Sequence, residues 1–294
     1  NFNRMVLAAR KIPRRYFYAL KAALYCLTTI FILQITRINL KNTPVDRLNQ
    51  RLYNKIKTGV IMQKIDVAAY IWTSYTGKEP RAKMFWPDGI GEWQTVKAAE
   101  AKFEGHLWPR KPLLGYKDEA DPETMEEQID LAESYGVNTF IYDWYWFDRR
   151  PFLEQCLDEG FLRAKNNFKM KFYIMWANHD ADSTWDKRIS DENTPFIWLG
   201  KTVPEDYYGE ICRRFLGYFT RENYYKVNGE ALLSIYNVQN FIDTFGGITE
   251  TKKAIEYLDT EAKKAGLKGV HFQAIVYGAN EKIRRRVYSA VRRS

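Results

Sequence analysis

The sequence predicts an α/β protein built from repeated βα units around a parallel sheet. From residue 64 onward, short apolar runs alternate with longer amphipathic ones, which is typical of strands followed by helices. An apolar share of 46% in 294 residues is enough for a sizeable core. Polar and aromatic residues gather where the apolar runs end, as expected at the carboxyl ends of parallel strands.

Five strands are expected in this region. They are residues 64–75, 137–147, 169–180, 230–237 and 268–278. A closed (β/α)8 TIM barrel has eight such units and needs about 250 residues. We therefore expect an incomplete TIM-barrel-like domain over residues 62–280, in a chain that is truncated or whose reading frame changes after about Asn280.

Helices are expected between the strands. Asp121 is placed to cap the first helix, Pro122 occupies its first turn and Gly136 ends it. A second helix is expected over residues 150–166. Four-residue spacing of apolar side chains predicts a third over 204–223, and a fourth is expected around 250–265. Residues 76–120 are too irregular for one element.

The positive charge lies at the two ends of the chain. Residues 1–61 carry twelve Lys and Arg against one acid, a net +11, and residues 281–294 carry six against one, a net +5. The segment 62–280 accounts for the remaining −7 of the total +9. An acidic domain argues against a nucleic-acid partner, because such partners present phosphates.

The first 61 residues form a basic, partly apolar extension that we expect to be helical. The run from Ala22 to Leu33 resembles the core of a signal peptide or a short signal anchor, so membrane association through residues 22–36 is one hypothesis. The protein would then be membrane-associated or extracytoplasmic. The alternative is a weakly attached or non-native extension on a cytoplasmic domain. Residues 281–294 form a basic tail.

The cysteines and histidines do not suggest a metal centre. Cys156 and Cys212 fall within predicted helices and, with Cys26, are read as structural thiols, while the three histidines are far apart in sequence. No cofactor is expected either, since no Gly-rich phosphate loop is present.

The strand ends instead indicate a saccharide site. Pyranose rings have an apolar face that stacks on aromatic rings and hydroxyls that bind carboxylates and amides. The stretch TFIYDWYWFDRR, residues 139–150, places several aromatic residues around one carboxylate, Asp143. The candidate substrate-binding residues are Glu92, Trp93, Asp143, Tyr145, Trp146, Trp176, Asn178, His179 and Tyr236.

Structural roles compete with this interpretation. Asp143 could be a buried acid held by backbone N–H groups or by Arg149. Asn178 and His179 could serve turn geometry, and Glu92 with Trp93 could anchor a loop. Strand alternation predicts that Phe140 and Trp144 face the helices, opposite Asp143 and Tyr145.

Five segments together resemble one known family. They are GIGEWQTVKAA, the 103–116 stretch ending PRKPLLGY, DPETMEEQIDLAESYGVNTFIYDWYWF, KFYIMWANHD and VNGEALLSIYN. The sequence is similar over about residues 65–278 to WbsX-like, glycoside hydrolase family 99-like proteins, which include relatives of endo-α-mannosidases. This resemblance implies a (β/α)8 barrel that acts on glycans. It places the family's aromatic-acid strand on residues 142–147, its W-A-N motif on 176–178 and its G-x-x-E-W motif on 89–93.

Two departures separate this sequence from the family pattern. After W-A-N, His179 and Asp180 stand where an acidic E-x-W continuation is common, and no N-E-W-x-E-like motif supplies the catalytic carboxylates. The catalytic residues are therefore unknown. The leading hypothesis is a glycoside hydrolase-like fragment, with two alternatives: a glycosyltransferase of surface-polysaccharide (O-antigen) synthesis, and a non-catalytic glycan-binding domain.

Overall fold

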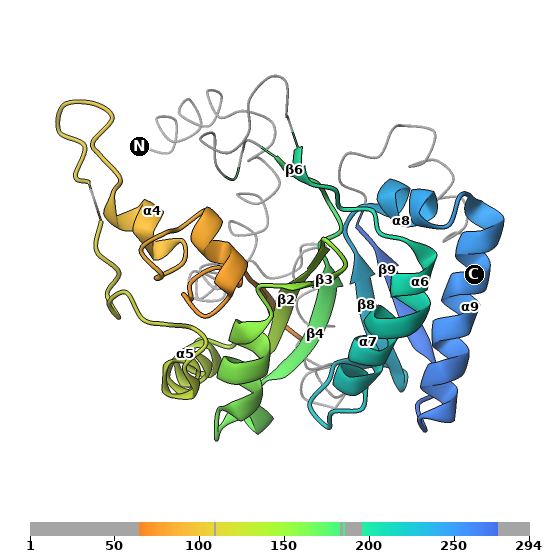
Figure 1. The fold of residues 1–294 in the computed structure, drawn as a ribbon. Coiled ribbons are helices and arrows are strands. Elements are labelled where there is room, and N and C mark those ends of the chain that lie inside the picture. The colour runs from red at the N-terminus through yellow and green to blue at the C-terminus, as the bar shows by residue number, and fades with distance from the viewer. Residues whose placement is uncertain (1–64, 109, 183–184, 186–195, 276–294) are drawn as a thin grey trace, which may run out of the picture. The chain divides into compact units, whose positions relative to one another are not determined.

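A computed structural model describes residues 65–108, 110–182, 185 and 196–275 of the chain (Figure 1). The described part from Asp66 onward belongs to one compact unit. The predicted extension, 1–61, the possible membrane segment, 22–36, and the basic tail, 281–294, lie outside the described residues. Among the residues that the structure describes, no helix combines the length and apolar character that a membrane span requires.

Five parallel strands form the sheet, as predicted. They are β1 (Ala68–Ile71), β2 (Thr139–Phe147), β4 (Lys171–Trp176), β8 (Glu230–Ile235) and β9 (Val270–Ala274). They pair in the order β1-β2-β4-β8-β9, all parallel, and the described sheet does not close into a barrel. The incomplete α/β architecture expected from the sequence is confirmed.

Short antiparallel strands extend this sheet or pair apart from it. They are β3 (Arg150–Phe152) beside β2, β7 (Lys226–Val227) beside β8, and a separate pair made of β5 (Ala181–Asp182) and β6 (Phe196–Trp198). The sequence analysis did not foresee any of them, because each has only two or three residues.

Helices follow most of the strands. They are α5 (Pro122–Ser134), the continuous run of α6 (Pro204–Asp206), η5 (Tyr207–Ile211) and α7 (Cys212–Phe219), then α8 (Val238–Thr244) and α9 (Ile248–Lys264). Asp121 caps α5 as predicted, because its Oδ1 accepts from the Glu123 N–H at 3.1 Å, and Gly136 follows with φ +85°. Helices α7 and α9 contact each other beside β8 and β9 (Figure 1).

The loop between β1 and α5 contains two short helices, η1 (Pro80–Met84) and α4 (Trp93–Lys97). The segment from β3 to β4 also folds into short turns: η2 (Cys156–Gly160), η3 (Phe161–Arg163) and η4 (Asn167–Lys169).

The predicted helix over residues 150–166 was wrong at its start. Asp148 and Arg149 adopt φ of 53° and 61°, and Phe147 pairs with Arg150, so these two residues form a tight hairpin turn. The chain therefore turns back along β2 as β3 before a single π-helical turn, η2, begins. Asp148 is a residue type that tolerates positive φ, but Arg149 stands where such turns usually have Gly, so only a weak turn signal is present in the sequence.

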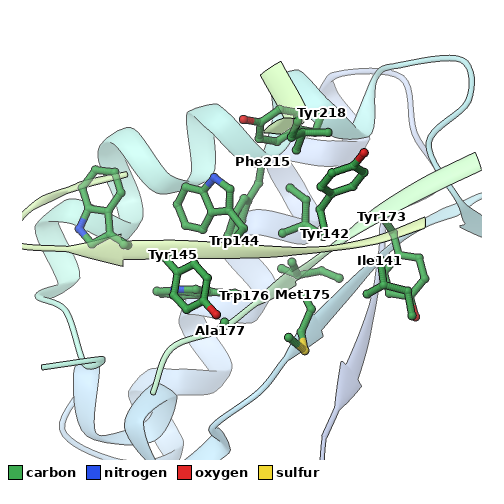
Figure 2. Close-up of a cluster of buried hydrophobic side chains, with 14 of the residues drawn as sticks. Ile141, Tyr142, Trp144, Tyr145, Tyr173, Met175, Trp176, Ala177, Phe215 and Tyr218 are labelled. Carbon is green, nitrogen blue, oxygen red and sulfur yellow. The ribbon is translucent and has the colours of Figure 1, made fainter. Parts of the chain in front are cut away.

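The main core lies between the sheet and its helices. Figure 2 shows Tyr142 and Trp144 of β2 pointing towards Phe215 and Tyr218 of α7. Trp144 and Phe215 have ring centroids 4.9 Å apart, and Phe140 contacts Phe161 at 6.0 Å. The predicted helix-facing positions of Phe140 and Trp144 are therefore confirmed.

We expect Phe172→Ala to lower the free energy of unfolding by about 3–5 kcal/mol. Phe172 is fully buried and packs against Phe161 and Tyr224 at 5.2 and 5.1 Å, so its removal leaves a cavity. The measurement is urea unfolding followed by circular dichroism. Phe168→Ala is the matched control: this ring is 74% exposed, so its loss should change stability by less than about 0.5 kcal/mol.

Candidate functional site

Strand β2 presents a second set of side chains on the face opposite the helices. Figure 2 shows Ile141 and Tyr145 pointing away from the side on which Tyr142 and Trp144 lie. Asp143 stands between Ile141 and Tyr145 in the alternation and shares their face. The position of a residue along β2 therefore determines which face of the sheet its side chain occupies. The side chains of residues 141, 143 and 145 point away from the helix-covered core.

Aromatic side chains from four segments gather around Tyr145 on this face. Its ring lies 5.6 Å from Trp72, 5.6 Å from Trp185 and 5.7 Å from His179, all nearly perpendicular. The His179 ring in turn lies 5.2 Å from Tyr236. We call this group, with its two acids, the aromatic–acid cluster: Trp72, Glu92, Asp143, Tyr145, His179, Trp185 and Tyr236.

Asp143 is the partly buried acid of the cluster. Its Oδ1 is inaccessible to solvent and has no hydrogen-bond partner among the described residues. Burial raises the pKa of the carboxyl to about 7, and the hydrogen bond with Tyr145 opposes this only in part. A carboxyl that is protonated near neutral pH can donate a hydrogen bond as well as accept one.

Asp143 also affects Tyr145. Burial raises the pKa of the Tyr145 hydroxyl well above its usual value, and the nearby carboxyls of Asp143 and Glu92 add to the rise. Tyr145 therefore stays a neutral phenol that can donate and accept hydrogen bonds. Arg149, considered earlier as a partner of Asp143, instead pairs with Asp206 at 2.8 Å.

Glu92 is the second acid, and the segment that follows β1 holds it in place. Its carboxylate accepts hydrogen bonds from the Trp72 indole and, at 2.7 Å, from the Ser74 hydroxyl. The backbone N–H of Glu92 donates to the Ser74 carbonyl at 3.0 Å. Gly91 makes this contact possible: at φ +60°, a Cβ there would lie 2.0 Å from the same carbonyl oxygen.

Asn178 lies beside the cluster but its side chain is engaged in joining strand ends. Its amide Nδ2 donates to the Asn237 carbonyl at 2.8 Å, and its Oδ1 accepts from the Asn237 N–H at 2.8 Å. Asn240 also donates to the Asn178 carbonyl at 2.9 Å. These bonds favour the structural role for Asn178. His179 keeps its ring in the cluster, with Nδ1 2.9 Å from the Asp180 carbonyl.

Trp146 and Trp176 do not join the cluster. Both are buried on the helix side of the sheet, where Trp146 stacks on Trp144 and Trp176 stacks on Tyr207. The Trp146 indole donates to Asp206 at 3.1 Å. The alternation along β2 that separates Trp144 from Asp143 also separates Trp146 from it, so neither tryptophan can reach a ligand bound at Asp143.

Trp93 lies next to Glu92 but contacts a different group of rings, Tyr75 and Tyr116. Two cluster members were missing from the sequence-based list. Trp72 directly follows β1, and this position at a strand end was the available signal. Trp185 follows β5 in a loop, and nothing in its sequence context places it beside Tyr145.

The described residues offer no metal site. No three His, Cys, Asp or Glu side chains among them approach closely enough to bind an ion.

We expect the difference in unfolding free energy between the wild type and Asp143→Asn to depend on pH. The folded-state pKa of about 7 lies above the ordinary value of 3.8, so the folded protein holds a proton that the unfolded chain has lost. Wild-type stability relative to the variant should fall between pH 4 and pH 7, by at most about 1.4 kcal/mol per pH unit, and level off above. Urea unfolding of both proteins at several pH values measures this difference in unfolding free energy.

Glu119 and Glu154 also have pKa values raised to about 7 by burial, but both are present in the two proteins and cancel in the difference. A difference that is flat with pH, or that rises, would contradict the assignment of a protonated Asp143.

Comparisons with known proteins give this cluster a family context. The curated relatives include the uncharacterized protein WxcX of Xanthomonas campestris pv. campestris, in strains B100 and ATCC 33913. Each is 30% identical over 160 residues, which cover 53% of this chain and 22% of the relative. The chain therefore matches about a fifth of the length of these relatives.

Two solved structures align with part of the chain. One is a glycoside hydrolase-like protein, 15% identical with a TM-score of 0.37, covering 56% of this chain and 46% of that one. The other is the GH99 endo-alpha-mannosidase from Bacteroides thetaiotaomicron, 16% identical with a TM-score of 0.31, covering 61% and 44%.

The family comparison is the most extensive in sequence. The family described as Glycosyltransferase WbsX matches residues 75–293, about three quarters of the chain, and these include every cluster member except Trp72. The chain belongs to the WbsX glycosyltransferase family.

Proposed function

We propose that the chain acts on glycans, as part of a glycoside hydrolase-like protein that binds saccharide at the aromatic–acid cluster. The observation that carries the proposal is the gathering of five rings, those of Tyr145, Trp72, His179, Trp185 and Tyr236, with two carboxyls, Asp143 and Glu92, on the face of β2 opposite α7. The WbsX family membership and the glycoside hydrolase titles of the structural neighbours agree with it.

The chemistry of the cluster suits a sugar ring. Aromatic faces and edges pack against the C–H face of a pyranose, while its hydroxyls both donate and accept hydrogen bonds. Near neutral pH, Asp143 can either donate a hydrogen bond to a sugar hydroxyl or accept one from it. The Glu92 carboxylate, already bound to Trp72 and Ser74, is fixed in orientation and therefore suited to accept from a ligand.

The cluster supports binding more directly than catalysis. Glycosidases place two carboxyls on either side of the bond they cleave, with different protonation states. The sequence contains no N-E-W-x-E-like motif to supply the pair expected from the family resemblance. We therefore assign Asp143 and Glu92 to saccharide contact.

Saccharide binding tests this proposal. We expect the wild type to bind manno-oligosaccharides in isothermal titration calorimetry, and Asp143→Ala to bind about tenfold more weakly, because losing a partner of a buried polar group costs about 1–3 kcal/mol. Asp130→Ala is the control, since this exposed acid lies on α5 and pairs only with Lys169 and Asn166 in the described structure.

The proposal fails if the Asp143 variant binds as tightly as the wild type. It also fails if the wild type binds none of a panel of neutral, amino and acidic oligosaccharides. Reducing-sugar release from the same oligosaccharides separates a hydrolase from a glycan-binding domain that does not turn them over.

A glycosyltransferase is the second candidate, favoured by the description of the family itself. It requires a site for a sugar nucleotide, and the Glu92 carboxylate of the cluster would repel a diphosphate. We therefore expect UDP-glucose and GDP-mannose to leave the thermal unfolding midpoint unchanged, measured by fluorescence with and without Mg²⁺. A clear rise in the midpoint that Asp143→Ala removes would favour the transferase.

A further inference from the structure

A second group of rings, Tyr75, Trp93 and Tyr116, is joined to the aromatic–acid cluster through the chain, because Trp93 directly follows Glu92. The ring centroids of Tyr75 and Trp93 are 4.3 Å apart, and those of Trp93 and Tyr116 are 5.4 Å apart. All three side chains are half-buried, and none belongs to the hydrophobic core or packs against it. Core packing therefore does not account for this aromatic surface.

The two groups of rings share one scaffold. Residues 72–75 carry Trp72 of the cluster and Tyr75 of the second group, and the carboxylate of Glu92 binds both Trp72 and Ser74. Trp93 directly follows Glu92. The two ring groups therefore lie on the same two segments, residues 72–75 and 92–93, which hydrogen bonds join.

This scaffold is fixed by backbone contacts. A Cβ on Gly77 would lie 1.6 Å from the Gly89 carbonyl oxygen, so only glycine allows the segments to approach this closely. The Trp93 indole donates to the Lys117 carbonyl at 2.7 Å, and the Glu119 N–H donates to the Tyr75 carbonyl at 3.0 Å. The rings are therefore held in place before any ligand arrives, which lowers the entropic cost of binding.

An open hollow of about 440 Å³ lies at the start of α5, lined by Lys117, Asp118, Asp121, Glu123, Thr124 and Glu127 and by none of the three rings. Its polar lining includes Lys117, whose carbonyl binds Trp93, and Asp118. Lys117 thus joins the ring group to a polar hollow whose side chains can bind hydroxyls.

We propose that Tyr75, Trp93 and Tyr116 form a second saccharide subsite, so that the protein binds an oligosaccharide chain across two aromatic groups rather than a single terminal sugar. This inference rests on the proposed function. The inference specifies the class of ligand as an extended chain of pyranose residues. It also names the residues that would contact only a ligand long enough to span both ring groups.

The test compares a manno-disaccharide with a manno-pentasaccharide by isothermal titration calorimetry on the full chain. We expect the wild type to bind the longer chain more tightly. Trp93→Ala and Tyr116→Ala should each weaken pentasaccharide binding by about three- to tenfold and leave disaccharide binding unchanged, because only the longer ligand reaches these rings. Trp108→Ala is the matched control: this tryptophan lies in the same long loop, is 37% exposed and has a ring contact with His106, outside both ring groups.

The results separate this inference from the proposed function. Equal losses for both ligands, or no loss in either variant, overturn the second subsite, while Asp143→Ala still reports on the first. If Trp93→Ala unfolds at a lower temperature than the wild type, the peripheral Tyr116→Ala decides the outcome. If the wild type binds saccharides of neither length, both proposals fail.

Discussion

The pleat of strand β2 is the constraint on which the rest of the structure depends. This strand is hydrogen-bonded to β1 on one side and to β4 on the other, so its register cannot slip without breaking two ladders. Consecutive side chains therefore go to opposite faces. Tyr142 and Trp144 enter the helix-covered core, while Asp143 and Tyr145 reach the other face. A slip of one residue would place Asp143 among Phe161, Phe172 and Phe215, where an unpaired carboxyl is costly.

The same constraint explains why one strand carries so many aromatic residues. Both of its faces are buried by large rings, but for different reasons. On the helix side Trp144 fills space between the sheet and α7. On the other face, Tyr145 is enclosed by side chains of loops that begin where neighbouring strands end, including Trp72, His179 and Trp185. The aromatic content of residues 139–147 thus serves a core and a candidate site at once.

The sequence predicted the elements that have strong periodicity. All five parallel strands and the helix predicted over 204–223, which ends at Phe219 in the structure, could be predicted from local patterns of apolar residues, and the cap at Asp121 from its residue type. The hairpin after β2 could not, because Asp148 and Arg149 hold a turn that usually signals itself through glycine. Within the site, Asp143, Tyr145, His179 and Tyr236 followed from strand ends. Trp146 was grouped with Asp143 because the alternation of side chains along the strand was applied to Trp144 but not to Trp146. The position of Trp185 depends on contacts between segments that are far apart in sequence.

Burial links the protonation of Asp143 to the rings around it. The carboxyl holds its proton near neutral pH chiefly because its surroundings exclude water. A saccharide that covers the cluster removes more water and so favours the protonated form further, unless its hydroxyls donate to the carboxyl and stabilise the charge instead. The two effects act in opposite directions on the affinity as pH rises. The direction of the pH dependence of binding therefore identifies whether Asp143 meets its ligand as a donor or as an acceptor.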